Sequence, residues 1–314
     1  MKNRFAFTMI ELIFVIVIMG ILAKFGASFL AQAYKSFLNT NVNSQLQSES
    51  EYAVEYIGKK LQYRIKDSVI ARTAAPPSPP VAIDSASGEN YIILEWVGID
   101  SDGFRGKSLP YWSGIIDLDD SNATSLSSPD TNTSQENNLT QVLSYGTTTI
   151  ADTALYFVGA NSDATTDYGW DGNITKINNQ QAALHPVKDV AGDISKFTNA
   201  TGTNNFTGVD VYEYYKLTWS AYAVVLEDYN ATGDGTGTLK LYYNYQPWKD
   251  KDSSGSSDQY NDAPNVKSTT IMEHVSTFRF MSIGSIIKIQ VCTKSDILKK
   301  DGGDYSLCKE KTIL

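Results

Sequence analysis

The sequence has 314 residues, 42% of them hydrophobic, and a formal net charge of −9 at pH 7. This length allows one large domain or two small ones, each with a core of its own. The acidic balance argues against general nucleic-acid binding, because neutralising the phosphates takes clustered Lys and Arg; it leaves room for DNA uptake through a local basic patch.

The first predicted element is a membrane-spanning helix at residues 7–30. Lys2 and Arg4 precede this apolar stretch, which contains one carboxylate near its start, Glu11. Roughly 20 apolar residues suffice to cross the hydrocarbon layer as a helix. A carboxylate at that depth costs about 2.5–3.5 kcal/mol on insertion scales, so Glu11 indicates a function and needs a partner. In the alternative interpretation, the stretch is a signal anchor and Glu11 lies at the level of the lipid headgroups.

A short basic segment ending in Ala6, followed by Phe7-Thr8-x-x-Glu11 and an apolar helix, resembles the prepilin signal of type IV pilins and type II secretion pseudopilins. The resemblance implies that residues 1–6 are a leader, that a prepilin peptidase cuts between Ala6 and Phe7, and that the new amino group of Phe7 is methylated. It also implies that Glu11 pairs with the N-terminal ammonium of a neighbouring subunit. The family usually has Gly before the cut, so Ala6 departs from its pattern.

The helix is expected to continue beyond the membrane as an amphipathic segment at residues 31–75, with its end near Ile70. At 1.5 Å per residue such a helix would be roughly 90 Å long. Its first half would lie in lipid or in the core of a filament, and its second half would pack one face against a head. The pattern consists of apolar residues mostly three or four positions apart: Leu30, Tyr34, Leu38, Val42, Leu46, Val54, Ile57, Leu61, Ile65 and Val69.

A proline-rich segment ends this pattern. Residues 76–80 read Pro-Pro-Ser-Pro-Pro, so we expect an extended linker at 76–90 rather than a ligand for a proline-binding groove. A β-rich head at 91–314 follows, with strands predicted at 91–97 and 111–118. Within the head, residues 119–210 are rich in Asn, Ser, Thr, Asp and Gly, which predicts a large exposed insertion with a few strands of its own.

Acidic residues gather near the first turns of the head. They are Asp100, Asp102, Asp117, Asp119 and Asp120. Calcium takes such oxygen ligands, and pseudopilins are known to use it, but the spacing does not follow the EF-hand pattern. We therefore expect solvated turn acids in preference to a calcium site, and no other metal or cofactor.

The strongest strand signal lies at 215–225, where apolar and polar residues alternate, followed by a second alternating run at 239–245; together they predict an antiparallel hairpin. A last hairpin is predicted at 275–292. It ends at Cys292, and joining Cys292 to Cys308 outside the cytoplasm would pin the tail to the sheet, a stabilisation of about 3 kcal/mol for a loop of this length. Two free thiols are the alternative.

The predicted fold is therefore α+β: a long N-terminal helix packed on an antiparallel β-sheet head with large loop insertions. This order again resembles pilin-like subunits. The stretches at 61–65 and 275–280 look like those of J-type minor pseudopilins and W-type minor pilins. Since major pilins are usually shorter, the resemblance implies a low-copy subunit at a filament tip.

Seven Asn-x-Ser/Thr sequences occur, and five of them have an acidic residue two positions before the Asn. That longer pattern resembles the acceptor of some bacterial oligosaccharyltransferases, so glycosylation of the head is expected; co-occurrence of Asp, Asn and Thr in turns is the alternative. The five are Asn122, Asn132, Asn138, Asn173 and Asn230, while Asn199 and Asn205 lack the acid.

The sequence shows no catalytic constellation, since His185 and His274 are far apart and neither adjoins a nucleophile motif, so we do not expect an enzyme. The expected role is a structural subunit of a type IV pilus or type II secretion-like filament. Its partners would be a prepilin peptidase, other pilin or pseudopilin subunits, an inner-membrane assembly platform and the membrane. The expected location is the bacterial inner membrane, single-pass with a periplasmic head, then the pilus or pseudopilus and the cell surface.

Two alternatives remain for the function. One is a tip adhesin or DNA-capturing subunit whose tyrosine-rich head contacts a ligand. The other is a membrane-anchored periplasmic protein outside any filament, in which Phe7 is never exposed by cleavage.

Overall fold

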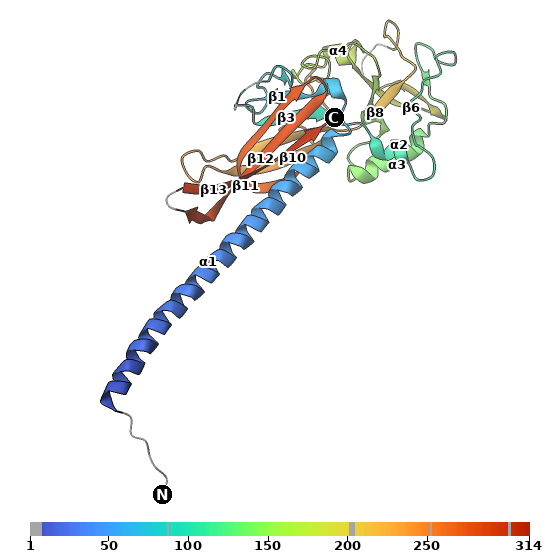
Figure 1. Ribbon diagram of the computed structural model, residues 1–314. Coiled ribbons are helices and arrows are strands. Elements are labelled where there is room, and N and C mark those ends of the chain that lie inside the picture. Colours follow the sequence, from blue (N-terminus) through green and yellow to red (C-terminus); the bar gives the residue numbers. More distant parts are fainter. Residues whose placement is uncertain (1–7, 87, 89, 201–204, 252, 301–302) are drawn as a thin grey trace.

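The computed structural model describes residues 8–86, 88, 90–200, 205–251, 253–300 and 303–314. A single long helix, α1 (Met9–Leu61), extends away from a head built of two antiparallel sheets (Figure 1). The larger sheet has eight strands in the order β13-β12-β11-β10-β9-β3-β1-β2, and the smaller has five in the order β4-β7-β6-β5-β8. The α+β class and the helix-then-head order are confirmed.

The strands are short in the first part of the head and long in the last. Their bounds are β1 (Ile70–Arg72), β2 (Val81–Ala82), β3 (Ile93–Val97), β4 (Leu126–Ser127), β5 (Thr153–Phe157), β6 (Leu184–Val190), β7 (Asp193–Asn199), β8 (Tyr215–Thr218), β9 (Ala221–Glu227), β10 (Gly237–Tyr245), β11 (Lys267–Ile283), β12 (Ile286–Lys300) and β13 (Gly303–Ile313). In the described part of the chain they are connected by three short helices and two 3-10 turns: α2 (Ser101–Arg105), α3 (Thr133–Leu143), α4 (Thr175–Asn178), Lys66–Ser68 and Ile150–Asp152.

Helix α1 begins at a capping box. The Thr8 hydroxyl accepts from the Glu11 backbone N–H, and the Glu11 carboxylate accepts from the Thr8 N–H at 2.9 Å. This reciprocal pair satisfies two of the donors that every helix start leaves unpaired. The same Glu11 that stands out in the apolar stretch therefore defines the first turn.

The helix ends at Leu61, nine residues before the predicted end. Beyond it the chain tightens, with Arg64 N–H donating to the Leu61 carbonyl, and then enters β1, because β3 offers that strand a pairing partner. Ile65 and Val69 are buried as their spacing suggested, but from extended and 3-10 backbone. Tertiary strand pairing has overridden a helical pattern here.

The strand expected at 111–118 is wrong. Residues 111–118 form no strand; they make isolated bridges, Ile115 to Tyr214 and Asp117 to Ser127. Within 76–90 the described residues of the expected linker contact the head, because the Ser78 carbonyl accepts from Arg72 and β2 pairs with β1.

The predicted strand at 215–225 is two strands in two sheets. β8 pairs with β5 in the smaller sheet, and after Trp219 and Ser220 β9 pairs with β3 and β10 in the larger sheet. The alternation is unbroken, but its apolar face is shared between two cores, with Tyr215 and Leu217 in one and Ala223 and Val225 in the other. The predicted hairpin with the next strand is confirmed as β9–β10.

The predicted last hairpin is confirmed and longer than expected, as β11–β12, and β13 adds a third strand. Cys292 on β12 lies directly opposite Cys308 on β13, and the two form the expected disulfide. The tail is thus attached to the sheet both by backbone pairing and by a covalent bond.

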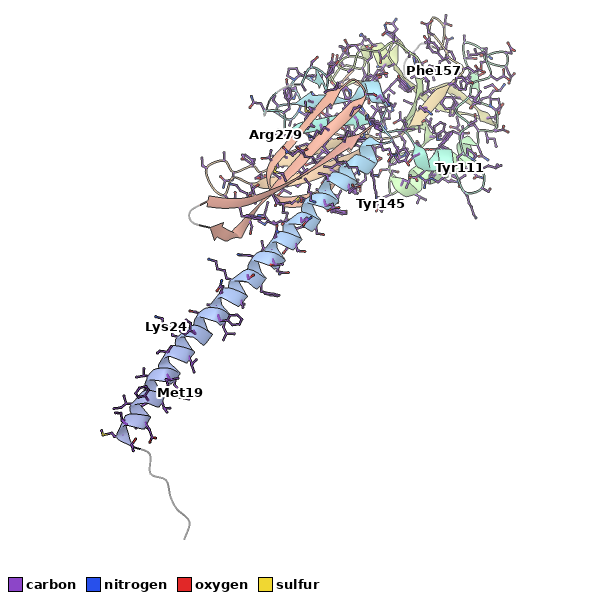
Figure 2. The ribbon with its side chains drawn as sticks, in the orientation of Figure 1. Met19, Lys24, Tyr111, Tyr145, Phe157 and Arg279 are labelled. Atoms are coloured by element: carbon purple, nitrogen blue, oxygen red, sulfur yellow. A yellow bond between two sulfur atoms is a disulfide. The ribbon has the colours of Figure 1, made fainter. Side chains whose placement is uncertain are left out.

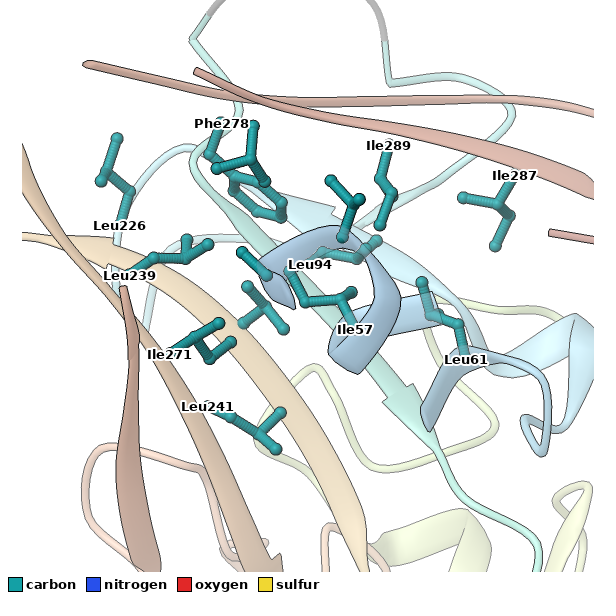
Figure 3. Packing of buried hydrophobic residues seen from close by; sticks show 14 of the residues in the cluster. Ile57, Leu61, Leu94, Leu226, Leu239, Leu241, Ile271, Phe278, Ile287 and Ile289 are labelled. Atoms are coloured by element: carbon teal, nitrogen blue, oxygen red, sulfur yellow. The ribbon is translucent and has the colours of Figure 1, made fainter. Parts of the chain in front are cut away.

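Three clusters of apolar side chains fill the space between the layers. The first lies between the second half of α1 and the larger sheet, where Ile57 and Leu61 project among Leu94, Leu239 and Ile289 (Figure 3). The second lies between the larger sheet and residues 154–184, and the third lies inside the smaller sheet. The polar stretch at 119–210 has strands of its own, as expected: it supplies α3 and four strands, and several of its apolar side chains lie in the third cluster.

A buried ion pair ties these layers together. Arg72 and Glu95, 1% and 0% exposed, approach to 2.6 Å between Nε and Oε1. Arg72 also donates to the Trp170 carbonyl at 2.6 Å, and Tyr245 donates its hydroxyl proton to the second Glu95 oxygen at 3.0 Å. One guanidinium thus links β1, β3 and the segment between β5 and β6 of the smaller sheet.

Candidate functional site

The first half of α1 is an apolar surface that no other part of the described chain covers. Every residue from Thr8 to Phe37 is exposed, including Phe14 at 65% and Phe25 at 70%. Met19 and Lys24 project from this part of the helix far from the head (Figure 2). The helix is long and apolar enough to cross a membrane. Since an apolar surface of this size is unstable in water, it needs lipid or other helices around it.

Glu11 is the charged group at the outer end of this surface. Its carboxylate accepts from the Thr8 N–H at 2.9 Å and from the Thr8 hydroxyl at 2.8 Å. A helix N-terminus favours a negative charge, and the first turn of the chain itself orients the Glu11 carboxylate. The cation expected to pair with it would come from another chain. Ala6 and Phe7, the predicted cleavage residues, lie outside the described residues.

The second half of α1 is fixed to the head along one face. Its buried residues follow helical spacing: Val42, Leu46, Ser50, Ala53, Val54, Ile57, Gly58 and Leu61. On its flank, Lys311 of β13 pairs with Glu55 at 2.5 Å, and Tyr305 donates to Asn43 at 2.8 Å. The last strand, which the disulfide joins to β12, therefore also holds the helix. The sequence predicted only that the disulfide would attach the tail to the sheet.

The end of α1 is fastened by Arg64. Its guanidinium donates to the Leu61 carbonyl at 2.8 Å, to the Ser285 carbonyl at 2.5 Å and to the Leu314 carbonyl at 3.5 Å. One side chain thereby joins the helix end, the β11–β12 turn and the last residue of the chain.

A cleft of about 540 Å³ lies beside this end of the helix. Tyrosines line it, among them Tyr56, Tyr63, Tyr222 and Tyr243. The Lys60 ammonium lies 5.3 Å from the centre of the Tyr222 ring, and burial lowers the pKa of Lys60. Several tyrosines of the head therefore line one cleft, and the Lys60 ammonium lies at its wall.

Two carboxyl groups face each other in the interior near α2 and α3. Asp100 and Glu136 are 3% and 1% exposed, and a methyl group at Gly103 would touch an oxygen of each. Trp112 donates its indole N–H to Asp100 at 2.8 Å, and Thr140 donates to Glu136 at 3.1 Å. Burial raises the pKa of Asp100, and burial together with Asp100 raises the pKa of Glu136 to about 9. Two buried carboxyl groups this close cannot both ionise readily, so the pair favours holding a proton.

The sequence missed this pair, because Glu136 is 36 residues from Asp100 and resembles an ordinary helix-surface acid. The remaining acids of the suspected calcium cluster serve local structure: the Asp117 carboxylate accepts from the backbone N–H groups of Asp119 and Asp120, and Asp120 pairs with Lys196. Among the described residues, no group of three or more His, Cys, Asp or Glu side chains is placed to hold a metal ion.

The two histidines are not brought together. His185 is buried on β6, and burial lowers its pKa to about 4, whereas His274 lies on β11. The five acid-preceded asparagines are also dispersed. Asn122, Asn173 and Asn230 lie in exposed loops, Asn132 caps the start of α3, and Asn138 lies on α3 itself.

Comparison with known proteins adds no assignment to this geometry. No protein-family model, no curated protein and no solved structure matches the chain.

Proposed function

We propose that this protein is a minor pilin-like subunit of a type IV pilus or a type II secretion-like filament, inserted through the first half of α1 and acting at the tip in assembly initiation. The observation that carries the proposal is α1 itself. One unbroken helix of 53 residues is exposed and apolar in its first half and built into the head in its second.

This division suits a subunit that moves from a membrane to a filament. In the bilayer, lipid covers the first half of the helix; in a filament, the same surface packs against the helices of other subunits. Both environments are dry, so a Glu11 carboxylate needs a cation in addition to its own capping box. The free N-terminal ammonium that cleavage before Phe7 would create on an adjacent subunit supplies one.

The head supports a location outside the cytoplasm. The disulfide between Cys292 and Cys308 persists in oxidising compartments and is rarely kept in the cytosol. The head has two sheets and three cores, which fits a low-copy terminal subunit better than one repeated along a fibre.

N-terminal analysis of the protein from its native host tests the proposal. We expect the mature chain to begin with a methylated Phe7 in cells with an active prepilin peptidase and to retain residues 1–6 in cells without it. Recovery of the uncut chain from cells with the active peptidase would refute the proposal, and would favour a membrane anchor outside any filament.

A pair of substitutions on the same helix tests assembly. Glu11→Ala should abolish co-purification with filament subunits, whereas Glu49→Ala, at an exposed position of the head-bound half, should leave it unchanged. Equal incorporation of both variants would contradict the role of Glu11.

The tyrosine-lined cleft favours a second candidate, a tip subunit that binds a ligand. Aromatic rings and a nearby ammonium can hold sugars, bases or anions. Tyr63→Ser, which changes a side chain 44% exposed, should then spare assembly and reduce attachment of cells or uptake of DNA. Unchanged attachment and uptake would remove this candidate.

A further inference from the structure

We propose that the head is N-glycosylated at three asparagines, Asn122, Asn173 and Asn230, by transfer from a sugar linked to a polyprenyl diphosphate. The proposal requires the head to lie outside the cytoplasm, where such donors are used, but it does not depend on assembly into a filament.

The starting point is an excess of acids before the acceptor sequences. Asp and Glu make up 35 of 314 residues, about one in nine, so fewer than one of the seven Asn-x-Ser/Thr sequences should have an acid two positions earlier by chance. Five of them do. An enzyme that recognises the acid, the asparagine and the hydroxyl together needs all three side chains on the surface of a folded head.

Three of the five sequences meet this requirement. In the first, Asp120, Asn122 and Thr124 are all exposed. The second has Asp171, Asn173 and Thr175 exposed, and the third has Asp228, Asn230 and Thr232 exposed.

The hydroxyl of each acceptor sequence already contacts its asparagine. The Oγ1–Oδ1 distances are 2.7 Å from Thr124 to Asn122, 2.6 Å from Thr175 to Asn173 and 3.3 Å from Thr232 to Asn230. In each case the hydroxyl donates to the amide oxygen, so the amide nitrogen is not engaged by it. That nitrogen is the atom to be glycosylated.

The other two sequences fail for different structural reasons. On α3, Asn138 is exposed, but its partners Glu136 and Thr140 are 1% and 0% exposed and are hydrogen-bonded to each other. Asn132 is only half-exposed, and it caps the 11-residue helix α3, since its amide oxygen accepts from the Gln135 N–H at 3.0 Å. The amide oxygens of the three loop asparagines also accept backbone N–H groups, but those asparagines are exposed. The same sequence pattern is therefore accessible in loops and inaccessible on a packed helix.

The transfer step is a substitution at the anomeric carbon of the donor sugar. A bond forms between the asparagine Nδ2 and this carbon while the bond from the carbon to the diphosphate oxygen breaks. The polyprenyl diphosphate leaves with the bonding electrons, and a carboxylate of the transferase accepts the amide proton. No oxidant or reductant is needed.

Glycopeptide mass spectrometry of the full chain from its native host tests the proposal. We expect sugar mass on the peptides that contain Asn122, Asn173 and Asn230, and none on the peptide that contains Asn138. Each of Asn122→Gln, Asn173→Gln and Asn230→Gln should lower the intact mass by one glycan, whereas the matched control Asn138→Gln should change it only by the substitution.

The acid is tested separately. Asp171→Asn should abolish modification of Asn173 and leave Asn122 and Asn230 modified. Absence of sugar at all three asparagines would overturn the proposal. Modification of Asn138 to the same extent as the loop sites would also overturn it, because accessibility in the folded head would then not determine which asparagines are glycosylated.

Discussion

The two halves of α1 share one helix and differ in where their contacts come from. From Val42 onward, buried residues recur on one face and meet the sheet, so the chain supplies its own packing. From Thr8 to Phe37 the helix is exposed all round, so its packing must come from lipid or from other chains. A helix that is apolar on one face is completed by its own domain, whereas one that is apolar all round depends on its surroundings.

The largest expected effect comes from the charge inside the head. Arg72→Ala would leave Glu95 buried without its ion partner, so the free energy of unfolding should fall by about 3–5 kcal/mol. Urea unfolding of the full chain in detergent measures it. Arg105→Ala, which removes an exposed pair with Asp102, is the control and should change stability by less than about 1 kcal/mol. Similar losses for both variants would mean that burial of the pair is unimportant.

An isoleucine in each half of α1 gives the most direct comparison. Ile57 is fully buried against the sheet, so Ile57→Ala should lower the free energy of unfolding of the head by about 2–5 kcal/mol. Ile16 is 62% exposed, so Ile16→Ala should leave the same transition within about 0.5 kcal/mol. A loss at Ile16 equal to that at Ile57 would show that the first half also packs on the head.

Removal of the disulfide tests how β13 holds the second half of the helix. A paired change, Cys292→Ser with Cys308→Ser, should cost about 3 kcal/mol, since the bond closes a loop of 16 residues. The variant should also show faster amide exchange in β13 by mass spectrometry. Ser306→Ala, an exposed neighbour on the same strand, is the control and should behave as the wild type.

The buried carboxyl pair predicts an effect on stability that depends on pH and that is, per pH unit, smaller than the losses above. Glu136 holds its proton to about pH 9 in the folded head but only to about pH 4.5 in the unfolded chain. Between these values the folded state binds more protons, so stability is greatest at the acid end and falls as the pH rises, by up to about 1.4 kcal/mol per unit. Denaturant unfolding from pH 5 to pH 9 should show this fall.

Glu136→Gln should flatten the fall, because the amide cannot ionise and still donates to Asp100. Glu213→Gln, at an exposed position, should retain the wild-type dependence on pH. Parallel curves for the two variants would contradict a proton held by the pair.

Much of the fold follows from local pattern. The apolar helix, the strand at Ile93–Val97, the β9–β10 hairpin and the pairing of the two cysteines could all be predicted, because each depends on neighbours in the sequence or on the only two cysteines present. The apolar residues that α1 buries were also predictable from Val42 to Leu61, because helical spacing holds there, whereas Leu30 and Tyr34 continue the same spacing but are exposed.

The failures all involve choices between remote partners. Apolar and polar residues alternate at 215–225 in the same way for one continuous strand as for a chain that changes sheets at Trp219. Only the positions of the pairing strands β5 and β3 decide between these two arrangements. Ile65 and Val69 satisfy helical spacing, yet the helix ends at Leu61 because the residues that follow Val69 pair with β3 as strand β1. The Asp100–Glu136 pair has no local signature, since it arises only when α3 folds onto α2.

The clamp at Arg64 has a mechanical consequence. Because its guanidinium binds the helix end, the turn at Ser285 and the carbonyl of Leu314, tension applied to the exposed half of α1 is delivered first to the strands that the disulfide reinforces. The smaller sheet lies beyond the larger one and outside this line of force. The loops of the smaller sheet can therefore change conformation or carry bulky groups without weakening the packing of the larger sheet on α1.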